Sequence, residues 1–295
     1  MIADMIPKLE KIPSAISSSI SVKREITPYM DYPLHYHPEY EIIFVKKSYG
    51  IRLMGSHIGN FSDGDLMFIS PNLPHVWRND QDFYQDNKDL FVDVYVIHFR
   101  EDALGKDFFE LPEFKRIRIL FQLGQQGMSI TGQAYDKISG LIKKVYKTRG
   151  IERLTLFLKI LDSLADTKEF RLLSSPGYTR SINITDGDRI NKVMEYLMEN
   201  YKQHILLEEA ARLVNLNKSS FCRYFKSRTR KTFTQFLNEI RTAHACKLLT
   251  NTKMTISEIC YEVGYNNISH FNRQFKLITS LTASEYAKKY LGTVR

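Results

Sequence analysis

The segment FNRQFK at residues 271–276 repeats the segment FCRYFK at residues 221–226, at an offset of 50 residues. A second matched pair precedes it, because ISEICYEVGY at residues 256–265 resembles LEEAARLVNL at residues 207–216, at an offset of 49. An internal repeat of this kind indicates two copies of one supersecondary unit. Each copy predicts an apolar helix, a short turn and a second helix, which is the layout of a helix-turn-helix motif. The second copy should have one additional residue in its turn.

The second helix of each copy has an apolar face and a polar face. Phe221, Tyr224 and Phe225 follow the i, i+3, i+4 spacing of a buried stripe, and Phe271 and Phe275 do so in the second copy. The outward side chains are then Ser219, Cys222, Arg223 and Lys226 in the first copy, and Ser269, Asn272, Arg273 and Lys276 in the second. Arginine can bind guanine through two hydrogen bonds and asparagine can do the same with adenine, so these faces suit the major groove of DNA.

The positive charge of the chain is concentrated in its last third. The whole chain has a net charge of +9, and residues 184–295 hold 18 Lys and Arg against 10 Asp and Glu. The segment KSSFCRYFKSRTRK, residues 218–231, contains no acid, which predicts an anionic polymer as its partner. Side chains at the back of the second helices or at loop ends are assigned to DNA phosphates: Lys218, Lys226, Arg228, Arg230, Lys231 and Lys276.

A helix predicted over residues 232–250 joins the two copies. At about 1.5 Å per residue it would be about 27 Å long, and successive major grooves on one face of DNA lie about 34 Å apart. A rod of that length can hold both second helices in adjacent grooves. The alternative is a helical core with a basic coat and no DNA partner. One copy alone would leave that alternative open, whereas two joined copies disfavour it.

The first third of the chain has the pattern of β-strands. Residues 39–54, 65–70 and 90–99 are rich in β-branched and aromatic side chains, and turn-forming segments at 62–65 and 71–75 separate them. Short strands with this punctuation are typical of an antiparallel sandwich or barrel.

Helical spacing replaces the strand pattern from about residue 103. Apolar residues recur every three or four positions from Tyr135 to Val145 and from Leu154 to Leu164, which predicts a helical hairpin. Its apolar stripes either pack on the sheet or form a homodimer interface, and the two uses are compatible. A stretch rich in Ser, Pro, Gly and Thr then predicts a linker. The predicted parts are a strand-rich domain (1–102), which the resemblance described below makes a ligand-sensing domain with an N-terminal arm, the hairpin (103–170), the linker (171–186) and a DNA-binding domain (187–295).

Several classes of protein are disfavoured by the sequence. No apolar run approaches the roughly 18 residues that span a bilayer, and the N-terminus lacks the pattern of an export signal. We therefore expect no membrane contact and a cytoplasmic location. The cysteines, Cys222, Cys246 and Cys260, show no CxxC spacing, which predicts neither a disulfide framework nor a zinc finger.

HYHPEYE at residues 35–41 brings three metal-type side chains close together. His35, His37 and Glu41 share one face of a strand because side chains alternate with period two. With His75 they would form a set of three histidines and one glutamate, which suits iron, manganese, nickel or zinc.

The same cluster has two other interpretations. It could form a pocket for a polar organic ligand such as a sugar, which Trp77 and His98 would also line, or it could be a group of surface histidines. No substrate-activating constellation accompanies the cluster, so we predict that the protein is not an enzyme and uses no cofactor.

The run from residue 207 to 290, above all ISEICYEVGYNNISHFNRQFKLITSLTASEY at 256–286, resembles the DNA-binding domain of the AraC/XylS family of bacterial transcription regulators. The resemblance implies base reading by Ser219, Cys222 and Arg223 in the first motif and by Ile268, Ser269 and Arg273 in the second. The chain departs from the family pattern at three positions. The usual glycines are Arg230 and Ser280, and the usual proline before SEY is Ala283.

Residues 20–100 resemble the sensor half of that family, a cupin-type β-barrel, through HYHPEYE (35–41), GDLMFISPNLPH (64–75) and HVWRN (75–79). The resemblance implies a small-molecule effector, a hairpin used for dimerisation, and RNA polymerase as a partner. The spacing from Glu41 to Gly50 and the position of Pro71 depart from metal-binding cupins. We therefore predict an effector pocket without metal, and keep His35, His37, Glu41 and His75 as an alternative metal site.

These observations predict an α+β chain in which a cupin-type β-barrel and a helical hairpin precede an all-α domain with two helix-turn-helix motifs. The predicted function is sequence-specific regulation of transcription from double-stranded promoter DNA, with activation favoured over repression, by a homodimer that responds to an effector. A metal-dependent, dioxygenase-like cupin enzyme with a helical appendage is one alternative. A constitutive DNA binder without sequence preference is another.

Overall fold

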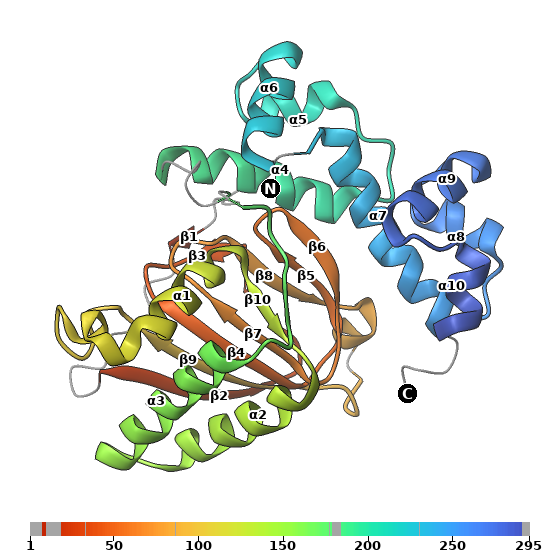
Figure 1. Cartoon of the computed structure of the whole chain (residues 1–295). Helices are drawn as coiled ribbons and strands as arrows, with labels where there is room; N and C mark the ends of the chain where they lie inside the picture. Colours follow the sequence, from red (N-terminus) through yellow and green to blue (C-terminus); the bar gives the residue numbers. More distant parts are fainter. Residues whose placement is uncertain are drawn as a thin grey trace. The chain divides into compact units, whose positions relative to one another are not determined.

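The structure is a computed structural model that describes residues 8–9, 19–32, 34–85, 87–176, 178, 184–229 and 231–290. The chain divides into two compact units. The first comprises Lys8–His57 and Phe61–Ser181, and the second contains Ile182–Arg295 (Figure 1). The first unit is rich in strands and the described residues of the second unit from 184 onward form helices, as the change of sequence pattern predicts.

The described strands form two sheets. One sheet has the order β1-β3-β8-β5-β6 and the other has the order β11-β10-β7-β4-β9-β2. The strands are β1 (Lys8–Leu9), β2 (Ile20–Thr27), β3 (His35–Tyr36), β4 (Tyr40–Lys47), β5 (Gly50–Met54), β6 (His57–Phe61), β7 (Asp65–Ile69), β8 (His75–Asn79), β9 (Val92–Phe99), β10 (Met128–Ile130) and β11 (Phe170–Leu172). No closed barrel is formed by these strands, so the barrel element of the fold prediction is not confirmed.

Side chains alternate along β4, so one face of the strand packs in the core and the other lines a cavity. Ile42 and Phe44 belong to the large apolar core of the first unit, whereas Glu41 and Ile43 point to the opposite face and line a cavity. The neighbouring strand continues the pattern, because Glu41 pairs with His98 and Ile43 with Val96 in the antiparallel register. A one-residue shift of β4 would therefore exchange the core face and the cavity face.

Three α-helices cover the apolar face of the six-stranded sheet. They are α1 (Lys115–Leu123), α2 (Gly132–Lys147) and α3 (Gly150–Asp166), with short 3-10 turns at Gln81–Tyr84, Phe108–Glu110, Pro112–Phe114 and Gly124–Gln126. Ile142 of α2 and Phe157 of α3 are fully buried in the same core as Phe99, and the Phe157 ring lies 4.9 Å from the Phe99 ring. The predicted hairpin is therefore α2–α3, and it packs on the sheet (Figure 1). Its use in a homodimer remains a prediction.

The described residues from 184 onward form helices that include both predicted helix-turn-helix motifs and the helix predicted over residues 232–250. They are α4 (Ile184–Asn200), α5 (Leu207–Leu213), α6 (Lys218–Thr229), α7 (Phe233–Asn251), α8 (Ile256–Glu262), α9 (Ile268–Thr279) and α10 (Ala283–Tyr290). Residues 214–217 separate α5 from α6, and residues 263–267 separate α8 from α9. The second turn is longer by one residue, as the offsets of the repeat predict. Within the described residues, no helix is long and apolar enough to cross a bilayer.

An ion-pair network joins three neighbouring strands of the six-stranded sheet, β4, β9 and β2. Asp93 of β9 is 2% exposed, and Arg24 of β2 donates to both of its carboxylate oxygens at 2.8 Å, while the Lys46 ammonium lies 2.7 Å from Oδ2. Hydrogen bonding from Arg24, which outweighs burial, together with Lys46 holds the pKa of Asp93 below its ordinary value. A carboxyl group with a lowered pKa stabilises the folded state above its unfolded pKa, and that contribution is lost as the pH falls.

The substitution Asp93→Asn is expected to lower the free energy of unfolding near neutral pH by about 2 kcal/mol. The expected cost is below that of a fully buried ion pair because Arg24 and Lys46 are partly exposed. The difference from the wild type should begin to shrink as the pH falls through about 4, the ordinary pKa of an unfolded aspartate, and should disappear only below the lowered pKa of folded Asp93. Urea unfolding at pH 7 and at about pH 2.5 measures both effects. The exposed Asp89→Asn substitution is the control, and an equal loss at both pH values would contradict the prediction.

Candidate nucleic-acid interface and candidate ligand pocket

The two helices predicted to read DNA, α6 and α9, have the predicted orientation. Phe221 and Phe225 of α6 and Phe271 and Phe275 of α9 are fully buried. The side chains predicted to read bases are exposed in both helices: Ser219, Cys222 and Arg223, and Ile268, Ser269, Asn272 and Arg273. The structure thus exposes every predicted base-reading side chain on α6 and α9, while the reading of bases itself remains a prediction.

Both helices begin and end with the same side-chain hydrogen bonds. The Asn217 side chain accepts from the Ser220 amide and the Asn267 side chain accepts from the His270 amide, each at 2.9 Å. At the other end, a threonine hydroxyl lies 2.8 Å from the carbonyl oxygen four residues earlier and accepts from the amide two residues later at 3.2 Å. This threonine cap is Thr229 in α6 and Thr279 in α9. Caps of this kind satisfy backbone groups that a helix end leaves unpaired, so the repeat in the sequence is also a repeat of hydrogen bonds.

The turn inside each motif needs one residue in the left-handed conformation. Asn215 has φ of 54° and Gly264, its counterpart in the second motif, has φ of 87°. A Cβ atom on Gly264 would lie 2.5 Å from the Tyr201 carbonyl oxygen, so only glycine fits there. Asparagine is among the residues that tolerate this conformation, which explains the first turn.

Three positions depart from the family pattern, and the two that the structure describes, Ser280 and Ala283, differ from each other in their structural setting. Ser280 ends α9 with φ of 63°, so the left-handed turn is kept although serine replaces the usual glycine. Ala283 is the first residue of α10, a position where proline is also tolerated. Arg230 lies outside the described residues.

The cations assigned to phosphates are not equivalent. Lys226 and Lys276 are exposed. Lys218 lies 2.7 Å from the Glu208 carboxylate and Lys231 lies 2.6 Å from the Glu239 carboxylate. Arg228 lies over the Tyr224 ring, with 5.7 Å between the guanidinium carbon and the ring centre. These acids partly neutralise Lys218 and Lys231, so Lys226 and Lys276 are the stronger candidates for phosphate binding.

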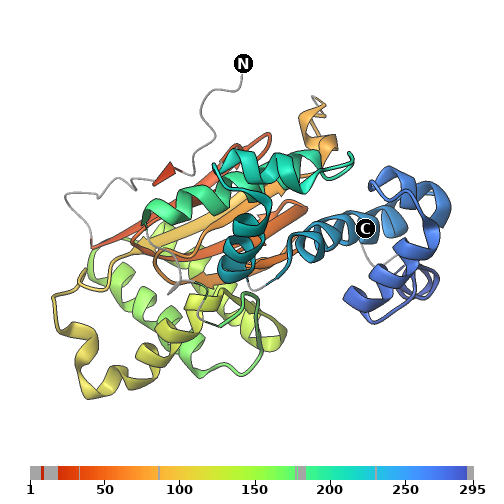
Figure 2. The same cartoon turned by 90° about the horizontal axis from the view of Figure 1, so that it is seen from above.

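One long helix connects the two motifs. The helix α7 begins with a capping box in which the Thr232 hydroxyl accepts from the Gln235 amide. Near this end, Phe236 packs on Phe225 of α6 with 5.6 Å between ring centres, and towards the other end Leu249 shares an apolar core with Phe271 of α9. Figure 2 shows α7 as a rod that runs to the blue cluster of α8, α9 and α10. Its length of about 28 Å follows from its 19 residues.

The first unit gathers three histidine side chains around one carboxylate oxygen of Glu41. Oε2 of Glu41 lies 2.8 Å from Nε2 of His37, 3.0 Å from Nε2 of His98 and 3.4 Å from Nε2 of His75. All four side chains are buried. Burial would raise the pKa of Glu41, but the histidines, His75 foremost, hold it well below its ordinary value, so this group is a carboxylate. The surface-histidine interpretation is therefore wrong.

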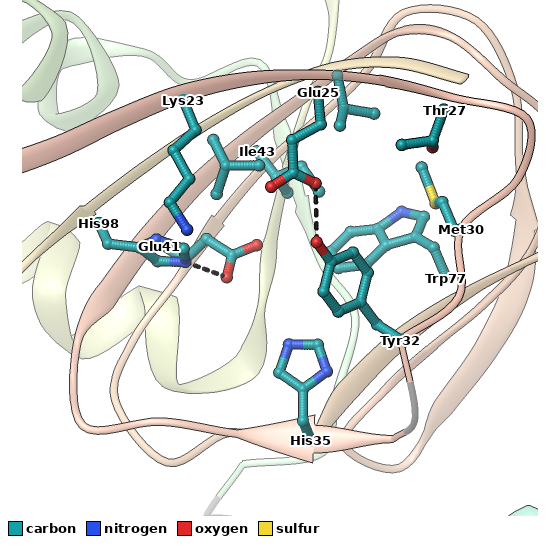
Figure 3. A pocket seen from close by; sticks show the side chains of 12 residues that line it. Lys23, Glu25, Thr27, Met30, Tyr32, His35, Glu41, Ile43, Trp77 and His98 are labelled. Carbon is teal, nitrogen blue, oxygen red and sulfur yellow. Dashed lines mark hydrogen bonds and ion pairs between the residues drawn. The ribbon is translucent and has the colours of Figure 1, made fainter. Parts of the chain in front are cut away.

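A cavity opens beside this cluster (Figure 3). Four of the six predicted pocket residues line it: His35, Glu41, Trp77 and His98. His37 and His75 contact Glu41 but are not part of the cavity wall. The other lining residues are Lys23, Glu25, Thr27, Met30, Tyr32, Ile43, Val94 and Val96.

Strand β2 also contributes to this cavity, which was not predicted from the sequence. Lys23, Glu25 and Thr27 alternate along β2 and therefore share one face. In Figure 3 Lys23 reaches towards Glu41, and the Tyr32 hydroxyl donates to the Glu25 carboxylate at 2.9 Å. The period-two pattern of residues 23–27 was a usable signal. It did not reveal that β2 pairs with β9, the strand that carries His98.

Comparison with known proteins gives a consistent result for the second unit. A family model for a helix-turn-helix domain matches residues 210–289. The chain is 23% identical over 270 residues to an uncharacterized HTH-type transcriptional regulator, YdeC, from Bacillus subtilis, covering 91% of this chain and 89% of the relative. It is 25% identical over 268 residues to the HTH-type transcriptional activator RhaR from Mannheimia succiniciproducens, covering 88% of each chain.

Among solved structures, ToxT from Vibrio cholerae aligns with 93% of this chain and 100% of its own, with 14% identity and a TM-score of 0.38, values too low to support a conclusion. The family match and the two relatives, together with the duplicated motifs, agree with the resemblance that the sequence predicts. Residues 210–289 therefore form an AraC-type helix-turn-helix DNA-binding domain, and the chain is similar over most of its length to transcription regulators that carry such a domain.

Proposed function

We propose that the chain recognises specific promoter sequences through α6 and α9 and changes their occupancy when a small molecule binds in the first unit. The observation that carries this proposal is the paired exposure of Arg223 and Arg273 on two helices with identical caps. Arginine in this position can form two hydrogen bonds to guanine, and two reading helices on one chain define a longer site than one.

The cavity beside Glu41 supports the sensing part of the proposal. It is bounded by imidazoles, a lysine, carboxylates and the Trp77 ring, a mixture that can bind both polar groups and flat apolar surfaces. We propose that an effector there shifts the protein between two states that differ in DNA binding. A cupin-like sensor fold, dimerisation through α2 and α3, and contact with RNA polymerase in the cytoplasm belong to the same proposal.

The name of one relative favours activation. RhaR is a transcriptional activator, and it aligns over 88% of this chain, including the first unit. We therefore propose that the chain activates transcription and has no enzymatic activity.

Selection of bound sequences from random double-stranded DNA, with the full chain, tests the central claim. We expect an enriched sequence with two recognition blocks about one helical turn, or about 10 base pairs, apart, because each motif enters one major groove. If no sequence is enriched and the affinity depends only on the salt concentration, the protein binds DNA without base preference.

A further inference from the structure

His37 and His75 present the same ring nitrogen to Glu41. Nδ1 of His37 lies 3.1 Å from the Glu39 carbonyl oxygen, and Nδ1 of His75 lies 2.7 Å from the Leu73 carbonyl oxygen. A carbonyl oxygen only accepts hydrogen bonds, so each Nδ1 carries a hydrogen. In a neutral imidazole the other nitrogen, Nε2, then has a lone pair and no hydrogen. The backbone thus orients Nε2 of both rings towards Glu41, and neutral rings would turn their lone pairs to it.

These lone pairs point at a negatively charged atom. Nε2 of His37 and Nε2 of His75 lie 2.8 Å and 3.4 Å from Oε2 of Glu41. Two lone pairs and a carboxylate oxygen repel one another unless a positive charge lies among them. Nε2 of His75 is buried and has no hydrogen-bond partner among the described residues, a costly arrangement unless a ligand binds it. A positive charge therefore belongs at this point, and either protons on the two rings or a metal ion among them supplies it.

His35 supplies a fourth donor to the same point. It pairs with His75 across β3 and β8, and their ring centres lie 4.4 Å apart. One ligand atom from each of His35, His37, Glu41 and His75 lies within 4.8 Å of all the others. Ligands on a metal ion at bond lengths of about 2.1 Å lie about 3 to 4 Å from one another, so small side-chain rotations are enough to bring all four into contact with one ion.

We propose that His35, His37, Glu41 and His75 bind a divalent first-row transition metal ion. Three imidazoles and one carboxylate suit zinc, manganese, iron or nickel better than magnesium or calcium, which prefer oxygen ligands. The carbonyl groups of Glu39 and Leu73 hold two of the rings, and Nε2 of His98 donates to the Glu41 carboxylate at 3.0 Å. Outer contacts of this kind orient the ligands of metal sites.

This inference revises the prediction of a pocket without metal and favours the alternative that the sequence left open. It goes beyond the proposed function and does not depend on it, because a chain that selects a promoter sequence need not bind metal. His35 and Glu41 also line the cavity, so an ion held by them faces any small molecule that enters. Oxygen atoms of that molecule would complete the coordination of the ion.

Metal binding by the full chain tests the proposal directly. The protein is purified without a histidine tag, stripped with a chelator and titrated with Zn²⁺ by calorimetry and with Co²⁺ by visible absorption. The variants are His37→Gln and His75→Gln, which keep side-chain bulk and polarity. The control is His204→Ala, which removes an exposed histidine from the second unit. Thermal unfolding of each metal-free variant identifies any that fails to fold.

The wild type and His204→Ala are expected to bind one ion per chain, with Co²⁺ absorption bands typical of nitrogen and oxygen ligands. His37→Gln and His75→Gln should each weaken binding about 100-fold or more while the metal-free unfolding temperature stays close to that of the wild type. The proposal is overturned if the wild type binds neither ion, or if both variants bind as tightly as the wild type. If a variant does not fold, the wild-type stoichiometry and Co²⁺ spectrum decide the question.

Discussion

Replacing Phe225 with alanine is expected to lower the free energy of unfolding of the helical unit by about 4 kcal/mol. The ring is fully buried and lies between 5.6 and 5.7 Å from the rings of Phe221, Phe233 and Phe236. Removing it loses the transfer free energy of a large aromatic side chain and leaves a cavity, and such substitutions typically cost about 3 to 5 kcal/mol. Because Phe225 joins α6 to α7, the reading helix should lose its fixed position and specific DNA binding should fall with stability.

Chemical unfolding followed by circular dichroism measures this effect, since the second unit contains most of the described helical residues. The matched control is Tyr261→Ala, which removes an aromatic ring that is 58% exposed and should change the free energy by about 0.5 kcal/mol or less. If Phe225→Ala lowers the free energy of unfolding by less than about 1 kcal/mol, this aromatic cluster does not hold α6 against α7.

Replacing both Arg223 and Arg273 with alanine is expected to weaken binding to the selected DNA sequence by about 1,000-fold. Each arginine in a bidentate contact with guanine contributes about 2 kcal/mol of base discrimination, which is about 30-fold in affinity. The two side chains lie on separate helices, so the effects should be nearly additive. Both are exposed, and the free energy of unfolding should therefore change little.

A mobility-shift assay with the selected sequence and a scrambled one separates base reading from general attraction to DNA. The double variant should lose its preference between the two, whereas Arg189→Ala, an exposed arginine of α4 outside both motifs, should keep it. Equal weakening on both sequences would assign Arg223 and Arg273 to phosphates instead of bases.

The helical unit could be predicted almost completely because its signals are local. The spacing of Phe221 and Phe225, and of Phe271 and Phe275, defines the buried face of each reading helix within one turn. The offsets of the repeat also predicted the extra residue in the second turn. The φ values of Asn215 and Ser280 could not be read from the sequence with the same ease, because neither is the glycine that the left-handed conformation favours.

The sheets were harder to predict because their contacts are distant in sequence. The residues of HYHPEYE share one face locally, but their contacts with His75 and His98 depend on the pairing of β3 with β8 and of β4 with β9. Lys23 joins the cavity only through the pairing of β2 with β9. Likewise, a closed barrel requires a register around the whole sheet, which no single segment specifies.

The threonine caps of α6 and α9 have a consequence for how this regulator can change its target. Each hydroxyl bonds to backbone groups of its own motif, so the bend after the reading helix is set without help from the side chains that face outward. Substitutions at the exposed positions of α6 and α9 can therefore accumulate while the angle between each reading helix and the helix that follows it is preserved. The fold of the two motifs and the DNA sequence that they recognise can therefore change independently of each other.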